Sequence, residues 1–355
     1  MPPYSDHYQP DFIPLPGNLI GPHPLHLQWS SEINFIFRAD LDALQHTVDA
    51  WLNKPIGRQK SFRALNPFVL VTYVNCSCSN MSCAGHSWQQ AICPNVRCAR
   101  AWLLGENRRK LAYLKYNLLT FTVFATSANG DTFGLVPFSF VDDGTAMVYF
   151  RENYGMNVTL GEFDSGEKEW QPGSPTFLDC FANMDGLTPT NVFKDAPAHM
   201  LRLEPRETMG DVESWSEVRH ARGGMLKHLC RNLGIAPGVQ PTSDHLHAVV
   251  RHMLKQQKSL ALKQFRGMPD GVNAFYKALN AYGPDVGTFH SAETVTSDFV
   301  LDFPCQEPTV LNNFPLAKDL GLKSGLRSVG AFQTHIDYRL RALEVVEDVL
   351  RRRNY

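Results

Sequence analysis

The sequence predicts an α+β protein built on an antiparallel β-barrel or sandwich that is decorated with helices. Segments rich in β-branched and aromatic residues follow one another over 68–74, 118–125 and 133–140, with short turns between the last two. Consecutive hairpins with few crossover helices are typical of antiparallel barrels. A barrel leaves no free strand edge, and a large one can enclose a ligand, so its interior is the default place for a site.

The N-terminal part predicts an arm, a strand and a helix. Residues 1–29 are rich in Pro, Gly and His, which favours an arm laid over a surface. Residues 33–37 predict a strand, and a helix is expected from Asp40 onward. Its apolar residues recur at helical spacing: Leu41, Leu44, Val48 and Leu52.

The rest of the chain alternates turn signals with strand and helix patterns. Asn129-Gly130 favours a hairpin turn, and Asp142-Asp143-Gly144 is expected to turn into a strand over 146–150. Further strands are predicted over 175–182 and 299–303, and helices over 215–233 and 245–257.

Composition and charge exclude several classes of partner. The chain has 355 residues, of which 43% are hydrophobic, with a net charge of -1 and a pI near 6.9. No overall field therefore attracts nucleic acid or an anionic membrane. The first residues lack a signal-peptide pattern, and no stretch approaches the roughly 18 apolar residues of a membrane span. We expect a cytoplasmic protein.

A cluster of cysteines and one histidine is open to two interpretations, a zinc site or a loop of reduced thiols. Thiolates and imidazole suit zinc, but the spacing lacks paired Cys-x-x-Cys knuckles. The alternative is a compact loop packed by reduced thiols. The residues concerned are Cys76, Cys78, Cys83, His86, Cys93 and Cys98.

Residues 138–161, from Phe138 to Gly161, resemble the central stretch of acetoacetate decarboxylases. In that family a strand, an Asp-containing turn and an Arg-Glu pair lead into a Pro-Lys-Lys-Leu-Gly element. Segments 37–44, 260–266 and 314–320 also resemble the family's first strand-to-helix step, a late strand and a closing segment. The resemblance implies one acetoacetate decarboxylase-like barrel over 1–355 and a homo-oligomer.

Two segments have no counterpart in short family members. These are a cysteine-rich insertion of about 76–110 and a helical insertion of about 207–257. Long insertions of this kind commonly sit at a barrel mouth, so we expect a rim and a lid.

The residues that carry the family's chemistry are replaced. By the resemblance, its two lysines fall on Val158 and Thr159, its glutamates on Thr72 and at or next to Tyr116, and its arginine on Ser30. The family's lysine forms an imine that accepts the electrons released with carbon dioxide, and Val158 cannot form one. The predicted ligand pocket comprises Thr72, Tyr154, Asn157, Val158 and Thr159.

Five other residues are candidates for catalysis. Lys115 and Lys263 could act as a relocated amine, although outward-facing lysines are the commoner case. Arg151 and Glu152 keep the family's pair and could clamp a carboxylate or simply fix the chain locally. Tyr116 is the fifth candidate.

Three functions follow as expectations, none needing a cofactor. The first is lysine-independent lyase, isomerase or cyclase chemistry on a carbonyl-containing small molecule in secondary-metabolite biosynthesis. The second is a barrel that binds a small carbonyl or carboxylate ligand without catalysis. The third is decarboxylation by a relocated lysine. Whether the protein is an enzyme stays open at this point.

Overall fold

Four long strands form the framework of the fold. The computed structural model describes residues 25–57, 61–81, 113–165, 177–182, 197–207, 258–266, 274–295, 298–305, 314–340 and 344–348. Strands β1 (Leu25–Arg38), β2 (Phe62–Met81), β3 (Tyr113–Ser127) and β4 (Thr132–Val141) pair antiparallel in chain order. They confirm the predicted strands and extend them. Residues 25–29, expected in an arm, instead belong to β1.

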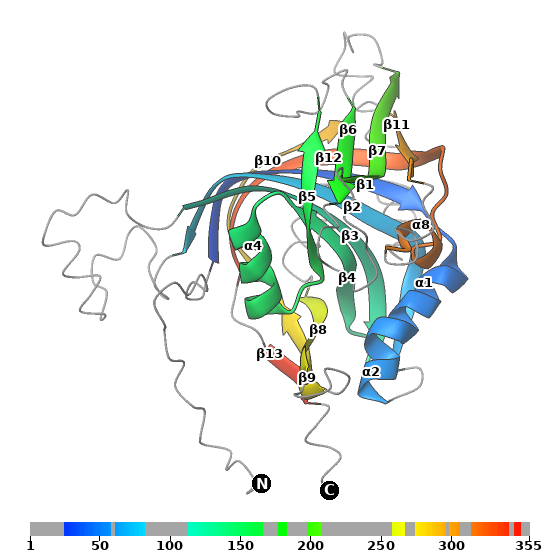
Figure 1. The fold of residues 1–355 in the computed structure, drawn as a ribbon, viewed down its shortest axis with the longest axis vertical. Coiled ribbons are helices and arrows are strands. Elements are labelled where there is room, and N and C mark those ends of the chain that lie inside the picture. The colour runs from blue at the N-terminus through cyan, green and yellow to red at the C-terminus, as the bar shows by residue number, and fades with distance from the viewer. Residues whose placement is uncertain are drawn as a thin grey trace, which may run out of the picture.

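Nine strands close into a ring. The ring runs from β4 through β5 (Val158–Asp164), β6 (Leu178–Ala182), β7 (Ala198–Glu207), β11 (Asp298–Asp302) and β12 (Leu326–Leu340) back to β1. In Figure 1, β5, β6 and β7 cross in front of β1, β2 and β3. The strands predicted over 175–182 and 299–303 are confirmed as β6 and β11.

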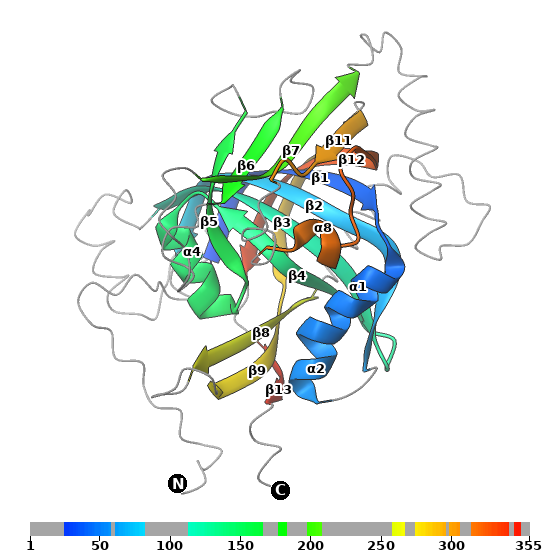
Figure 2. The ribbon, with the colours of Figure 1, turned by 45° about the vertical axis from the view of Figure 1, so that its right-hand side comes forward.

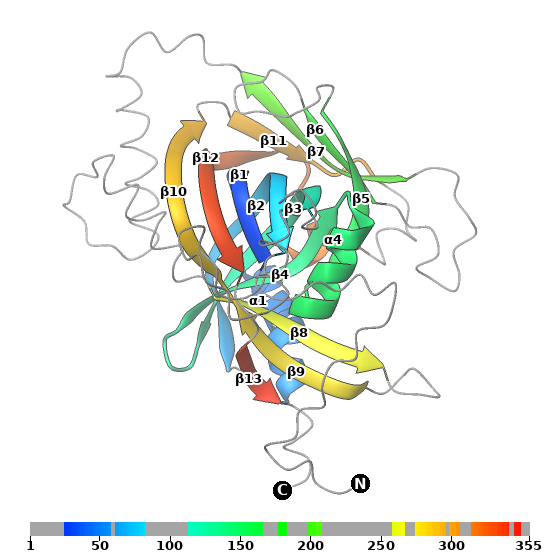
Figure 3. The same cartoon turned by 90° about the vertical axis from the view of Figure 1, so that its left-hand side faces the viewer.

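The barrel is mixed, so the expectation of an antiparallel barrel is only partly right. Strand β4 pairs parallel with β5 and also with β8 (Lys258–Arg266), the late strand expected over 260–266. A parallel pair needs a crossover connection, and residues 142–157 supply one between β4 and β5. Strand β9 (Ala274–Tyr282) joins β8, and β13 (Glu344–Asp348) joins β9, while β10 (Pro284–Val295) pairs with β12 (Figure 3).

The crossover contains a helix where a strand was expected. Residues 146–150 lie in α4 (Gly144–Tyr149) and in the π-helical turn η3 (Phe150–Tyr154). The side chain of Asp143 caps α4 by accepting a hydrogen bond from the backbone N–H of Ala146 at 2.7 Å. Ala146, Tyr149, Phe150 and Tyr154 are buried at helical spacing, which places one apolar face of this helix against the sheet.

The predicted N-terminal helix is confirmed and lies beside a short C-terminal one. Asp40 caps α1 (Leu41–Val48), which continues through the π-helical turn η1 (Asp49–Asn53) into α2 (Lys54–Ile56). The expected closing segment forms α8 (Leu316–Asp319), which contacts α1 (Figure 2).

Apolar side chains fill the interior of the ring. One cluster, here called the barrel core, draws buried residues from β1–β4, β6, β7, β11 and β12, with Phe163 of β5 packed against it. Rings meet across the barrel, since Phe35 contacts Phe299 at 4.8 Å between centroids and Tyr73 contacts Phe163 at 5.6 Å. The described residues that face the inside of the ring thus form a packed apolar cluster.

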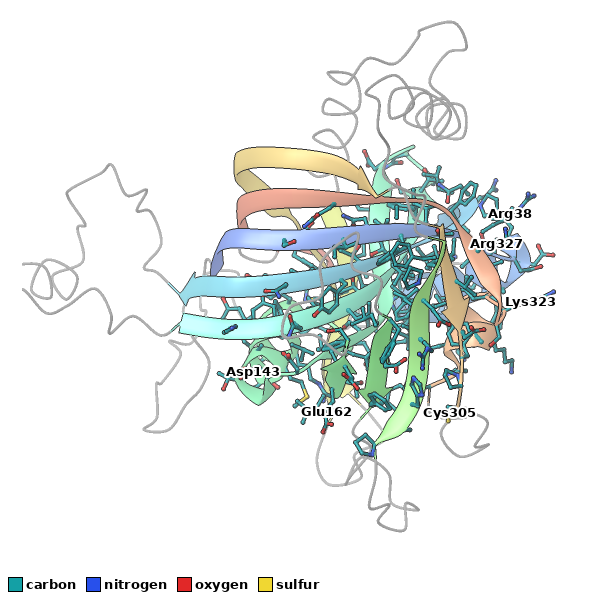
Figure 4. All side chains as sticks on the ribbon, turned by 90° about the horizontal axis from the view of Figure 1, so that it is seen from above. Arg38, Asp143, Glu162, Cys305, Lys323 and Arg327 are labelled. Atoms are coloured by element: carbon teal, nitrogen blue, oxygen red, sulfur yellow. The ribbon has the colours of Figure 1, made fainter. Side chains whose placement is uncertain are left out.

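Several expectations fall outside the described residues. They are the arm over 1–24, the helices over 215–233 and 245–257, and most of both insertions. Among the described helices, none has the length and apolar character needed to cross a membrane. Basic side chains of Arg38, Lys323 and Arg327 lie at one end of the molecule, away from Asp143 at the start of α4 (Figure 4).

Candidate functional site

Four polar side chains form a row across the outer side of the barrel. Asn34 of β1 lies opposite Thr72 of β2, Thr72 opposite Thr120 of β3, and Thr120 opposite Ser139 of β4. Ser139 in turn lies opposite Val158 of β5. Directly opposed residues point to the same face of a sheet. We call Asn34, Thr72, Thr120 and Ser139 the polar row.

Alternation places the polar row on the side of the sheet opposite the barrel core. Each member stands between two apolar residues of that core, as Thr72 does between Val71 and Tyr73. The same pattern holds for Phe138 and Phe140 around Ser139. The row therefore faces outward from the ring.

Hydrogen bonds fix most of the polar row. The Thr72 hydroxyl donates to Oδ1 of Asn34 at 2.8 Å, and the Ser139 hydroxyl donates to the backbone oxygen of Asn157 at 2.9 Å. Asn34, Thr72 and Ser139 are buried, whereas Thr120 is only half-buried. Thr120 is thus the most accessible member of the row.

A second cluster covers the end of the polar row at Val158. Helix α4, η3 and strands β8 and β9 pack over the outer side of β2–β5 there. Val158 is only 1% exposed within this cluster. We call it the aromatic cluster, after its tyrosines and phenylalanine; its members are Val74, Cys76, Tyr116, Leu118, Val141, Ala146, Tyr149, Phe150, Tyr154, Met156, Val158, Ala261 and Tyr282.

The structure places the five predicted pocket residues on both faces of the sheet, with Thr72 three strands from Val158. Thr72 and Val158 share the outer face, and Tyr154 contacts Tyr282 in the aromatic cluster at 5.5 Å between ring centroids. Asn157 adjoins them, but its amide donates to the Pro137 carbonyl at 2.7 Å and so ties β5 to β4. Thr159 lies opposite Phe140 of the barrel core, so it points to the other face.

The candidates on β3 separate into one buried and one exposed residue. Tyr116 is buried in the aromatic cluster and meets the Phe150 ring edge-on at 5.5 Å. Lys115 next to it is exposed. Successive residues of a strand point to opposite faces, which accounts for the difference.

Arg151 and Glu152 lie in the turn η3, where Arg151 is exposed and Glu152 half-buried. Within the described residues no ion pair joins them. Their backbone carbonyls both accept hydrogen bonds within the protein. The Arg151 carbonyl accepts from the Gly155 N–H, and the Glu152 carbonyl accepts from the ammonium group of Lys263.

Lys263 is the candidate lysine nearest to the aromatic cluster. It stands on β8 two residues after Ala261, a cluster member, and is half-buried. Burial lowers the pKa of its ammonium group, and the charge of Glu152 opposes that shift. Gly155, with φ of 68°, lies so close that a Cβ there would be 2.8 Å from the Cβ of Lys263.

Two further polar residues were not identified from the sequence. Glu32 is 7% exposed and precedes Asn34 by two residues, on the same face of β1. Asn280 is 1% exposed and lies opposite Ala261, so it shares the face of the aromatic cluster. Neither Nδ2 nor Oδ1 of Asn280 has a hydrogen-bond partner in the described structure. A polar residue isolated within an apolar strand is the signal that could have identified both.

The zinc site at the cysteine and histidine cluster stays a prediction. Cys76 carries a thiol buried in the aromatic cluster, and Cys78 lies in β2. Cys83, His86, Cys93 and Cys98 fall outside the described residues. Within the described part, no group of three or more potential ligands could hold a metal ion.

Comparison with known proteins relates this geometry to one enzyme fold. No protein-family profile matches the sequence, and no curated protein does. The acetoacetate decarboxylase of Legionella pneumophila has a similar structure, with a TM-score of 0.55 and 14% identity over 95% of this chain and 94% of that one. A second acetoacetate decarboxylase structure gives 0.53 and 13% identity, over 94% of this chain and 93% of that one. The chain therefore has the fold of the acetoacetate decarboxylases.

Proposed function

We propose that this chain is a divergent member of the acetoacetate decarboxylase-like superfamily that acts on a carbonyl-containing small molecule without forming an imine at Val158. The observation that carries this proposal is the position of Val158. Its aliphatic side chain ends the polar row and is buried among aromatic rings, at the place where the family resemblance puts the reactive lysine. Neutral hydroxyl and amide groups stand where an amine would be needed.

The polar row supports activation of a carbonyl by hydrogen bonding. A hydroxyl such as that of Thr120 can donate to the carbonyl oxygen of a ligand and stabilise charge that develops there. Preorganised donors of this kind act without covalent attachment. Many isomerase and cyclase reactions of carbonyl compounds, and those lyase reactions that eliminate a group from the β-carbon, begin with the removal of a proton from the carbon next to the carbonyl.

Glu32 is the described carboxylate best placed to take that proton. It lies on the same face of the sheet as the polar row, two residues from Asn34 on β1, and its side chain would have to extend across β2 to reach the carbon next to a carbonyl bound at Thr120. The C–H bond breaks, its proton passes to the Glu32 carboxylate, and its electron pair moves to the carbonyl oxygen as an enolate. Return of the proton to another atom gives an isomer, so the step needs no oxidant or reductant.

Hydrogen–deuterium exchange tests this proposal. Methyl levulinate in heavy water should lose its signals next to the ketone faster with the protein than without it, as followed by NMR. Glu32→Gln should lower the protein-catalysed rate by about 100-fold or more. Glu162→Gln changes an exposed glutamate on β5 and should leave the rate unchanged. Equal rates in Glu32→Gln and the unsubstituted protein would refute the role of Glu32.

A relocated amine is the second candidate function, and the half-buried position and lowered pKa of Lys263 favour it over Lys115. Imine chemistry at Lys263 requires that Lys263→Gln abolish catalysis. Lys115→Gln, which changes an exposed lysine, is the matched control. In the lysine-independent account both variants keep their exchange activity.

Non-catalytic binding is the third candidate, favoured by the absence of charged side chains from both the polar row and the aromatic cluster. A protein that binds methyl levulinate but never accelerates its exchange would establish it. A homo-oligomer is the part of the proposal that comes from the family resemblance. Secondary-metabolite biosynthesis and a cytoplasmic location are proposed alongside it.

A further inference from the structure

We infer that this site selects uncharged carbonyl compounds, such as ketones, aldehydes and esters, over carboxylates, with Thr120 as the residue that contacts the ligand oxygen. The inference rests on the proposed function, because it takes the polar row as the ligand site. It narrows the ligand class, which the sequence left as carbonyl or carboxylate.

The charges around the site argue against an anion. The four members of the polar row are neutral, and so is every member of the aromatic cluster. Among the described residues, the charged side chains nearest to them on this face are Glu32, two residues from Asn34, and Lys263, two residues from Ala261. The ammonium group of Lys263 donates one hydrogen bond to the backbone carbonyl of Glu152, which directs this cation toward η3.

Transfer of a carboxylate into such surroundings is unfavourable. A charged group that leaves water loses far more solvation than a neutral ketone does, unless a cation pairs with it. The carboxylate of Glu32 adds a like charge two residues from Asn34. A methyl ester of the same acid avoids both penalties while keeping the ketone.

Asn280 gives independent support for a neutral ligand. Its buried amide offers both donors and acceptors, and in the described structure none of them is used. An unsatisfied buried amide is unfavourable by about 1–3 kcal/mol, and a ligand that pairs with it would remove that penalty. A donor and an acceptor side by side match an oxygen-rich neutral molecule better than a carboxylate, which only accepts.

Thr120 is the member of the row that a ligand can reach. Asn34, Thr72 and Ser139 are buried on either side of it, and all three already donate to or accept from protein groups. The half-buried hydroxyl of Thr120 remains the accessible donor at the centre of the row. Thr120→Val keeps the shape of the side chain and removes that donor.

Two matched pairs of ligands test the inference by isothermal titration calorimetry. They are acetoacetate with methyl acetoacetate, and levulinate with methyl levulinate. In at least one pair the ester should bind about tenfold or more tightly than the acid. Thr120→Val should weaken ester binding about five- to tenfold, since a hydrogen bond to a neutral group contributes about 0.5–1.5 kcal/mol. Thr126→Val, at the far end of β3, should bind like the parent protein.

Three results would overturn the inference. These are acids that bind as tightly as their esters, a Thr120→Val variant with the same melting temperature and unchanged ester affinity, and no binding of any of the four compounds. Catalysed exchange on both acids and esters with equal affinity would end the inference and leave the proposed function standing. Selective ester binding without catalysed exchange would contradict the proposed function and leave the inference about the ligand class standing.

Discussion

The ammonium group of Lys263 donates a hydrogen bond to the backbone carbonyl of Glu152, which fastens strand β8 to the turn η3. Gly155, at the end of the same turn, packs directly against the side chain of Lys263. This contact joins two segments far apart in the sequence and holds η3, with its aromatic residues Phe150 and Tyr154, against β8.

The lowered pKa of Lys263 predicts a pH dependence of stability. In the unfolded chain the group titrates near 10.5, and in the folded protein burial lowers its pKa. Between these two values the unfolded state binds more protons, so the free energy of unfolding rises with pH there. This contribution is complete above 10.5 and is lost as the pH falls through the folded pKa. In urea unfolding, the free energy of unfolding of Lys263→Gln should rise less with pH than that of the parent protein. The free energy of unfolding of Lys115→Gln should rise as much as that of the parent protein. An unchanged slope in Lys263→Gln would contradict the burial of this amine.

A pair of glycine substitutions tests the contact between η3 and β8. Gly57 and Gly155 both end helical segments with φ of 68°, but an added Cβ meets nothing within 4 Å at Gly57. Gly57→Ala should therefore show only the backbone penalty of about 1–2 kcal/mol. Gly155→Ala adds overpacking against Lys263, which we expect to contribute about 1–3 kcal/mol more. Urea denaturation measures the difference, and equal losses would show that β8 does not pack on η3 as described.

Substitution by leucine should change the free energy of unfolding in opposite directions at two buried asparagines, Asn53 and Asn280. Asn53 is 3% exposed and its amide is satisfied, since it donates to the Phe62 carbonyl and accepts from the Phe62 N–H, both at 2.9 Å. Asn53→Leu should lower the free energy of unfolding by about 2–4 kcal/mol, because the Phe62 N–H loses its acceptor and the Phe62 carbonyl keeps only the longer hydrogen bond from the Gln45 amide, at 3.5 Å. Asn280→Leu removes an unsatisfied amide and should raise stability by about 1–3 kcal/mol, at the expense of ligand affinity. A loss of stability in Asn280→Leu measured without ligand would show that this amide has a partner in the protein.

Local patterns predicted the strands of the barrel better than its crossover. Segments such as 68–74 and 118–125 combine β-branched and aromatic residues, and all of them are strands. The apolar run 146–150 carries the same composition, yet it is helical. Asp143 supplies an N-cap, and the buried residues recur at three and four positions, so the helical period was present in a run too short to reveal it.

The candidate site was predictable only in part because it depends on register. The family resemblance identified Thr72 and Val158, which share one face, but it also named Thr159, which alternation turns to the other face. Asn34, Thr120 and Ser139 each stand between two apolar neighbours within a strand, which is a visible signal. These residues lie opposite one another because of the register in which the four strands β1–β4 pair. No local sequence pattern specifies that register.

Borohydride trapping with a bound ketone tests the central claim most directly. Native mass spectrometry should first show the protein with methyl levulinate held non-covalently. After treatment with sodium borohydride and denaturation, we predict the mass of the unmodified chain, because Val158 offers no amine and Lys263 donates to a backbone carbonyl. A reduced adduct on Lys263 or any other lysine would contradict the account and establish imine chemistry in this barrel.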